Sequence, residues 1–198
     1  MPKYNVTLDE SHVYRVDGIV CPSVTQILSR TGLADYSSIP HFMRDFALER
    51  GSAVHKAAHY YLEGDLDEET VDPIIQGYIR ALDKFVFHSD FVPEPGTAEQ
   101  ICYDPMNAYC GTWDIIGSLP QIGRVIVDFK CGMMPAVHWQ LAAYGRLADP
   151  PIYNRIALRL SKDGTYKPKL FPASTFARHE ADFLAARRVY GLLEGATA

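Results

Sequence analysis

The sequence has no apolar run close to the roughly 20 residues that a membrane-spanning helix needs. Residues 1–5 do not begin an apolar signal-peptide core, so we expect no secretory leader. The chain also lacks internal repeats and low-complexity segments, which excludes repeat architectures. With 198 residues, 47% of them hydrophobic and 22% charged, it has the composition of one soluble globular domain.

Cysteine pairs and excess positive charge are missing as well. The four cysteines show no CxxC spacing, so neither a zinc ribbon nor a disulfide framework is indicated, and we expect a reducing, intracellular setting. A net charge of -5 argues against a protein that coats nucleic acid by bulk electrostatics, although it leaves room for a local basic groove.

The first half of the chain is predicted to be mainly helical after an initial hairpin. Asp17-Gly18 is a typical two-residue turn between strands at 14–16 and 19–21. Ser23 and Gln26 form a capping box at the start of the next helix. The predicted helices run from Ser23 to a stop at Gly32, over 41–48, over 51–63, and to His88 from Asp72 as N-cap, with Pro73 at N1.

The second half is predicted to hold the sheet. The expected strands are 98–103, 109–118 and 123–130, forming an antiparallel meander, followed by 152–160 and 165–170. Helices are expected over 136–147 and 174–193. We therefore expect an α/β fold with a mixed central sheet flanked by helices, as a single domain over 1–198 in which 1–50 is a hairpin and helical extension.

A charged pair interrupts the otherwise apolar strand at 124–130. Side chains alternate along a strand, so Asp128 and Lys130 share one face while Val127 and Phe129 point to the other. Burying either charge without a partner is costly. A salt bridge between the two is the purely structural interpretation, and a bound cation is the functional one.

Two more carboxylates, Glu99 and Asp114, interrupt strands that otherwise look buried. Three carboxylates that face one point repel each other, which raises a pKa or recruits a cation. Oxygen ligands favour hard ions such as Mg²⁺ or Mn²⁺ over zinc. Together with the ammonium group of Lys130, such a site suits hydrolysis of a phosphodiester.

Five motifs occur along the chain. They are R-G-S-A-V-H from Arg50 to His55, then Glu99, G-T-W-D ending at Asp114, D-F-K from Asp128 to Lys130, and Q-L-A-A-Y from Gln140 to Tyr144. Their order resembles the RecB-like branch of the PD-(D/E)XK nuclease superfamily, whose pattern is R-G-x-x-x-H, E, G-x-x-D, D-x-K and Q-L-x-x-Y. Residues 22–28 are similar to segments of phage-encoded exonucleases and of the mitochondrial genome maintenance exonuclease, so the resemblance spans 22–144.

The resemblance implies a restriction-endonuclease-like core and a metal-dependent DNA exonuclease of phage or bacterial recombination, replication or repair. It implies DNA as the substrate, one or two Mg²⁺ or Mn²⁺ ions, a single-strand annealing or replication protein as partner, no membrane, and a bacterial or phage-infected cytoplasm. The roles implied are Asp114, Asp128 and the Phe129 carbonyl as principal metal ligands, His55 and Glu99 as added ligands, Lys130 as the catalytic lysine, and Gln140, Tyr144 and Arg50 as DNA-contacting or orienting residues.

One position departs from the family, because Cys131 stands where threonine often follows the lysine; we expect this to be tolerated. Iron-sulfur members of the branch carry a cysteine cluster near the C-terminus. No cysteine follows Cys131, so no such cluster is expected.

Several alternatives remain open. A structure-selective or flap endonuclease would use the same site, and a non-catalytic nucleic-acid-binding module would share the fold. His55 and His59 match half of a zinc-protease helix, but Lys56 stands where H-E-x-x-H requires glutamate. Taken alone, His55 and Tyr144 could be core residues, and His59 is expected to be a surface or packing histidine.

Overall fold

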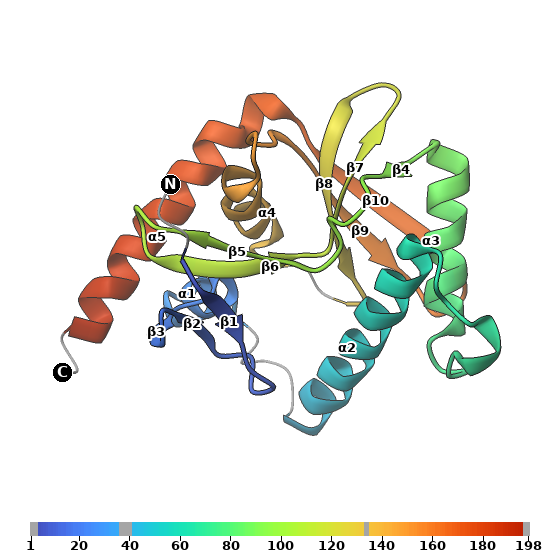
Figure 1. The fold of residues 1–198 in the computed structure, drawn as a ribbon, viewed down its shortest axis with the longest axis horizontal. Helices are drawn as coiled ribbons and strands as arrows, with labels where there is room; N and C mark the ends of the chain where they lie inside the picture. Colours follow the sequence, from blue (N-terminus) through green and yellow to red (C-terminus); the bar gives the residue numbers. More distant parts are fainter. Residues whose placement is uncertain (1–3, 36–40, 133–134, 196–198) are drawn as a thin grey trace.

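The protein is described by a computed structural model that covers residues 4–35, 41–132 and 135–195. Its centre is a five-stranded mixed sheet in the order β10-β9-β8-β7-β4 (Figure 1). The strands are β4 (Val92–Pro93), β7 (Ile115–Leu119), β8 (Gly123–Lys130), β9 (Asn154–Leu160) and β10 (Tyr166–Phe171). β8 and β9 run parallel, and the other neighbours are antiparallel, which confirms a mixed sheet with β8 at its middle.

Helices cover both faces of this sheet, as predicted. Helices α4 (Val137–Leu147) and α5 (Phe176–Gly195) lie on one side, while α2 (His41–Glu63) and α3 (Gln76–Ser89) lie on the other (Figure 1). Ile126 of β8 packs in the α4–α5 core, whereas Val127 and Phe129 pack in the α2–α3 core. Side chains on the two faces of β8 therefore pack into two different hydrophobic cores.

The predicted strand over 109–118 is wrong in one respect, because it is two strands in different sheets. β6 (Tyr109–Trp113) pairs with β5 (Gln100–Asp104) in a separate two-stranded sheet, and β7 begins directly after Asp114. The Asp114 carboxylate accepts a hydrogen bond from the backbone N–H of Phe129. This side-chain bond replaces the backbone–backbone hydrogen bond that a continued strand would make. The predicted meander thus consists of two antiparallel pairs that part at Asp114.

The N-terminal hairpin is confirmed and gains a third strand. β1 (Val6–Leu8), β2 (Tyr14–Val16) and β3 (Ile19–Cys21) form a three-stranded sheet. Helix α1 (Val24–Arg30) follows with both bonds of the predicted Ser23–Gln26 capping box. This sheet packs on β5 and β6 rather than standing apart.

Two helix boundaries differ from the prediction. The helices expected over 41–48 and 51–63 are one continuous helix, α2, since Gly51 costs only about 1 kcal/mol in a helix interior and nothing else there breaks it. Helix α2 also continues past residue 50, where the N-terminal hairpin and helical extension was expected to end. Asp72 does not cap α3; it accepts the Ile74 N–H within a preceding turn, and the helix begins at Gln76.

Strand β4 and two 3-10 helices were not predicted, whereas the other remaining elements lie close to their predicted ranges. Two short 3-10 helices, Glu68–Thr70 and Ala173–Thr175, precede α3 and α5. Within the described ranges, no helix combines the length and the apolar character that crossing a membrane requires.

Candidate metal centre

Three side chains from separate segments meet beside the point where the two sheets part. Nδ1 of His55, on α2, lies 3.1 Å from Oδ1 of Asp114 and 3.9 Å from Oε1 of Glu99. One potential ligand atom from each of the three lies within 4.8 Å of the others. The structure therefore brings together the helical histidine and two of the predicted carboxylates.

Asp128 and Lys130 lie next to this cluster and line the same cavity. Lys130 Nζ is 2.7 Å from Oδ2 of Asp128, and the Asp128 side chain is only 2% exposed. Phe129 lies between them and donates its N–H to Oδ2 of Asp114. Because the N–H and C=O of one strand residue point to the same neighbour, the Phe129 carbonyl also faces the Asp114 side, as the metal assignment requires.

Glu99 is held in place by its backbone. It adopts a left-handed conformation with φ of 52°, which is uncommon for glutamate, and its N–H donates to the Asp114 carbonyl at 3.0 Å. Strain of this kind persists only where surrounding contacts fix it. The segment that leads to Glu99 supplies those contacts.

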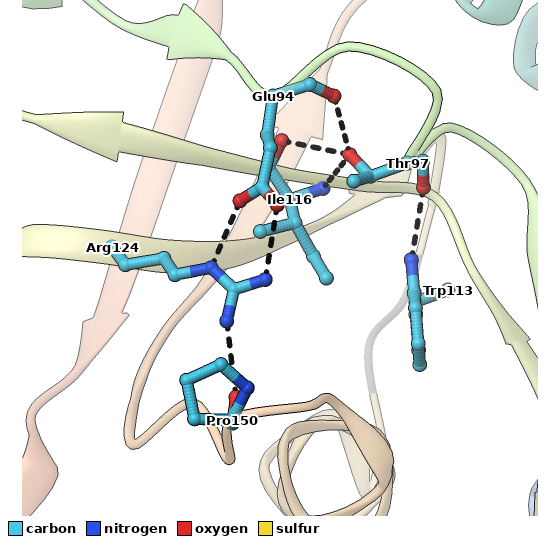
Figure 2. Close-up of polar contacts among 6 residues, drawn as sticks. All are labelled: Glu94, Thr97, Trp113, Ile116, Arg124 and Pro150. Atoms are coloured by element: carbon cyan, nitrogen blue, oxygen red, sulfur yellow. Dashed lines mark hydrogen bonds and ion pairs between the residues drawn. The ribbon is translucent and has the colours of Figure 1, made fainter.

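That segment, residues 94–99, is tied to the central sheet through Thr97 (Figure 2). The Thr97 hydroxyl lies 3.1 Å from the Ile116 carbonyl and accepts the Ile116 N–H at 3.2 Å, while the Thr97 carbonyl accepts the Trp113 indole N–H at 2.9 Å. One threonine thus joins the Glu99 segment to both sheets.

An ion pair fixes the start of the same segment (Figure 2). Arg124 of β8 donates from Nε and Nη2 to the two carboxylate oxygens of Glu94, at 2.8 and 3.1 Å. Its third nitrogen, Nη1, donates to the Pro150 carbonyl at 3.0 Å. Bidentate pairs of this type are both strong and geometrically specific.

The acidic groups and the histidine perturb one another's protonation. Burial lowers the pKa of His55, but the charge of Asp114 and the hydrogen bond to it outweigh burial and raise the pKa to about 9. Burial and the charge of Asp114 raise the pKa of Glu99 to about 7. Burial also raises the pKa of Asp128, to about 6, against the opposing charge of Lys130. Burial is the main reason that the pKa values of Glu99 and Asp128 are raised, and the neighbouring charge of Asp114 adds to it.

Asp114 shows the opposite shift. Burial would raise its pKa, but the His55 charge, the hydrogen bond from His55 and the Lys130 charge lower it below its usual value. Asp114 is therefore the carboxylate most ready to ligate a cation.

The residues fit a hard divalent cation. Glu99 and Asp114 each offer a carboxylate oxygen, His55 offers an imidazole, and Asp128 is a neighbouring carboxylate. Mn²⁺ and Mg²⁺ accept ligands of these types. Ligands bound at about 2.1 Å are at most about 4.2 Å apart, so the widest separation in the cluster closes by a small movement on binding. His55, Glu99 and Asp114 would hold such an ion, and Asp128 lies beside them in the cavity lining, outside the cluster itself.

Gln140 and Tyr144 lie one turn apart on α4, as predicted, but they play different parts. Tyr144 is buried, and its hydroxyl oxygen lies 3.2 Å from Nε2 of Gln140, which lines the cavity. A Cβ on Gly111 would fall 2.4 Å from Cε1 of Tyr144. The glycine of the G-x-x-D motif is thus required by close packing of the tyrosine.

Arg50 is not brought to the site. It lies on α2 outside the residues that line the cavity, with its guanidinium carbon 5.7 Å from the Phe46 ring centroid and 5.8 Å from that of Tyr78. Its Nε has no hydrogen-bond partner among the described residues. Its positive charge also acts on the thiol of Cys131, the residue after Lys130, so Arg50 lies near the cluster but not on the wall of the cavity.

The cavity above the cluster measures about 580 Å³ and has walls that the motifs did not indicate. Lys56 and His59 line it from α2, and His59 was notable in the sequence only because it stands four residues after His55. Ser52 and Thr25 also line it, and they lie within the R-G-S-A-V-H motif and the 22–28 segment without having been assigned a role. His12 lines it from the β1–β2 turn, where no pattern in the sequence indicated it.

Comparison with known protein families and with curated proteins finds no match for this chain.

Proposed function

We propose that this protein is a metal-dependent deoxyribonuclease with a restriction-endonuclease-like core, of the RecB-like PD-(D/E)XK type, that acts as an exonuclease. One observation carries the proposal. His55, Glu99 and Asp114, from three segments far apart in sequence, converge beside the Asp128–Lys130 pair in one cavity. The residues that meet are those of the nuclease motifs.

Each side chain has a defined task in phosphodiester hydrolysis. A bound Mg²⁺ or Mn²⁺ would polarise the phosphate and lower the pKa of water. Asp114, Asp128, Glu99 and His55 would hold that ion. Lys130, whose Nζ is held 2.7 Å from Asp128, places an ammonium where negative charge develops on the phosphate oxygens.

The other residues position the substrate. Gln140 presents an amide to the cavity and is steadied by the Tyr144 hydroxyl at 3.2 Å. Asn or Gln amides can donate to phosphate oxygens and accept from an ammonium group. This arrangement suits orientation of the scissile phosphate against Lys130.

The test is cleavage of end-labelled single- and double-stranded linear DNA beside a closed circle, with Mg²⁺ or Mn²⁺. We expect linear DNA to be degraded and the circle to survive. Asp114→Asn and Lys130→Met should lose at least about a hundredfold in rate, and Asp65→Asn, on an exposed loop, should match the wild type.

Degradation of the circle would assign endonuclease activity instead. A wild-type protein that binds DNA without cleaving it would identify a non-catalytic module. Full activity of Lys130→Met would overturn the role of the lysine.

A further inference from the structure

The turn between β1 and β2 holds a histidine in an unusual conformation. Oδ1 of Asp9 accepts the N–H groups of Ser11 and Val13, both at 3.0 Å, and the Asp9 carbonyl accepts the N–H of His12 at 2.9 Å. These bonds hold His12 in the left-handed region, with φ of 57°. Such conformations cost free energy and tend to be kept where they aim a side chain for function.

The turn is anchored to the strand that leads to the metal cluster. Tyr14, two residues after His12, is buried, and its hydroxyl lies 2.9 Å from the Thr112 hydroxyl on β6. Thr112 precedes Asp114 by two residues and lines the cavity. The Cys110 N–H also donates to the Pro22 carbonyl at 2.9 Å. The position of His12 is thereby coupled to the cluster.

His12 lines the same cavity as Asp114 and Lys130, together with residues of α2. In Figure 1 the β1–β2 turn extends toward the N-terminal half of that helix. Ala47 and Leu48, from this half of α2, line the cavity with His12. The β1–β2 turn and α2 therefore both contribute to the wall of the cavity that holds the cluster.

A phosphate chain in this cavity would meet little positive charge. The protein carries a net charge of -5, and the lysines that line the cavity in the described part of the chain are Lys56 and Lys130, the latter 2.7 Å from Asp128. Phosphates beyond the scissile one must then be bound by hydrogen-bond donors. An imidazole offers an N–H donor in either protonation state, and His12 is exposed.

We propose that His12 contacts a phosphate of the bound strand next to the one that is cleaved, and that the β1–β2 turn forms the second wall of the substrate groove. The inference rests on the proposed nuclease function for its substrate. It assigns a binding role to a part of the chain that lies before every motif residue.

The test compares His12→Asn, His12→Gly and Ser11→Ala. Asparagine and glycine both tolerate the left-handed conformation, so neither should disturb the turn, and neither reaches as far as an imidazole. Ser11 is exposed in the same turn and does not line the cavity, which makes Ser11→Ala the matched control. Measurements are kcat and KM on an end-labelled oligonucleotide, and the Kd of a fluorescein-labelled ten-thymidine oligonucleotide in the non-cleaving Asp114→Asn background.

Both His12 variants should raise KM and Kd by about tenfold to a hundredfold, as loss of one hydrogen bond to a charged group implies, with kcat within about twofold and Tm unchanged. Ser11→Ala should leave all four values unchanged. An unchanged KM and Kd, or a fall in kcat alone, would overturn the role of His12. The proposed nuclease function would still stand in that case if the wild-type protein cleaves DNA.

The reverse outcome separates the two claims. If the wild type cleaves nothing but binds the oligonucleotide in a His12-dependent way, the nuclease proposal fails and the binding role stands. A protein that neither cleaves nor binds refutes both.

Discussion

His55 on α2 and Asp114 between β6 and β7 are joined by a bond of 3.1 Å between Nδ1 and Oδ1. This contact links a helix to the point where two sheets part, across 59 positions of sequence. It also leaves His55 with a raised pKa, because a buried carboxylate stabilises the imidazolium. In the metal-free protein, a proton therefore occupies the position that a cation would need.

Metal binding should consequently be pH-dependent. A cation must displace protons from His55, with a pKa raised to about 9, and from Glu99, with a pKa raised to about 7. Both groups lose their protons as pH rises, so the affinity for Mn²⁺ should increase from pH 6 to pH 9, by up to about tenfold per unit for each displaced proton. Calorimetric titration with Mn²⁺ in buffers of different ionisation enthalpy measures the affinity and the protons released.

His55→Gln should remove the rise in Mn²⁺ affinity that occurs toward pH 9, which is due to His55. It should keep the rise around pH 7, which is due to Glu99. His59→Gln, one turn further along α2 and outside the cluster, should retain the full dependence. An affinity that does not change between pH 6 and pH 9 would contradict this assignment of ligands.

Asp128→Asn should stabilise the metal-free protein while abolishing cleavage. Burial raises the pKa of Asp128 to about 6 from its ordinary value of 3.8, so the native state binds the proton more tightly than the unfolded state does. The native state then loses stability as pH rises through 3.8 to 6, and the full loss is present above pH 6. Asparagine removes this cost and can still accept a hydrogen bond from Lys130.

In EDTA at pH 8 we expect a gain on the order of 1–3 kcal/mol in the free energy of unfolding. Urea denaturation at pH 8 and pH 4 checks it, since the gain should vanish at the lower pH. A loss of stability at pH 8 would show that the charge of Asp128 is well compensated in the metal-free protein.

Gly111→Ala should destabilise the fold through Tyr144. The added Cβ would lie 2.4 Å from Cε1 of that buried ring, which must move or distort the strand. Overpacking of this kind costs about 1–3 kcal/mol. Combining Gly111→Ala with Tyr144→Ala should cost less than the sum of the single substitutions, as measured in a double-mutant cycle of urea unfolding. Strict additivity would mean that the two residues are not in contact.

Thr97→Val should weaken metal binding although Thr97 touches no ligand atom. Its hydroxyl takes part in bonds with Glu94 and with both backbone groups of Ile116, and these hold the segment that ends at Glu99. Valine keeps the shape and removes the bonds, so Glu99 should lose its fixed position. Mn²⁺ affinity should fall by about tenfold or more, as for other supporting residues of metal sites.

Thr70→Val is the matched control, since the Thr70 hydroxyl donates to the Asp67 carbonyl within a short 3-10 helix and does not line the cavity. It should leave Mn²⁺ affinity unchanged. Equal affinities for the Thr97→Val and wild-type proteins would show that Glu99 does not depend on this segment.

Local patterns in the sequence predicted most of the framework. The Ser23 capping box, the Asp17-Gly18 turn and the alternation of β8 each follow from contacts within a few residues, and each is confirmed. The motifs likewise indicated most of the residues that meet at the cluster.

What the sequence did not predict depends on contacts between distant residues. The break at Asp114 arises because its side chain accepts the N–H of Phe129, fifteen positions away. His12 reaches the cavity through the packing of an N-terminal sheet on β6, and Arg50 points instead toward rings of α2 and α3. None of these relationships has a period or a spacing that a local pattern could reveal.

A single residue, Asp114, joins β6 to β7, and the segment that ends at Glu99 joins β4 to β5, so both of these links between the small sheet and the large sheet pass through the cluster. Any change in the angle between the sheets moves the carboxylate that meets His55. Cation binding and sheet orientation are then thermodynamically linked. A sheet orientation that increases the affinity for the cation is itself stabilised by the bound cation, by the same free energy. Ligands that reach only the small sheet, far from any carboxylate, would thereby alter the affinity of the site for its ion.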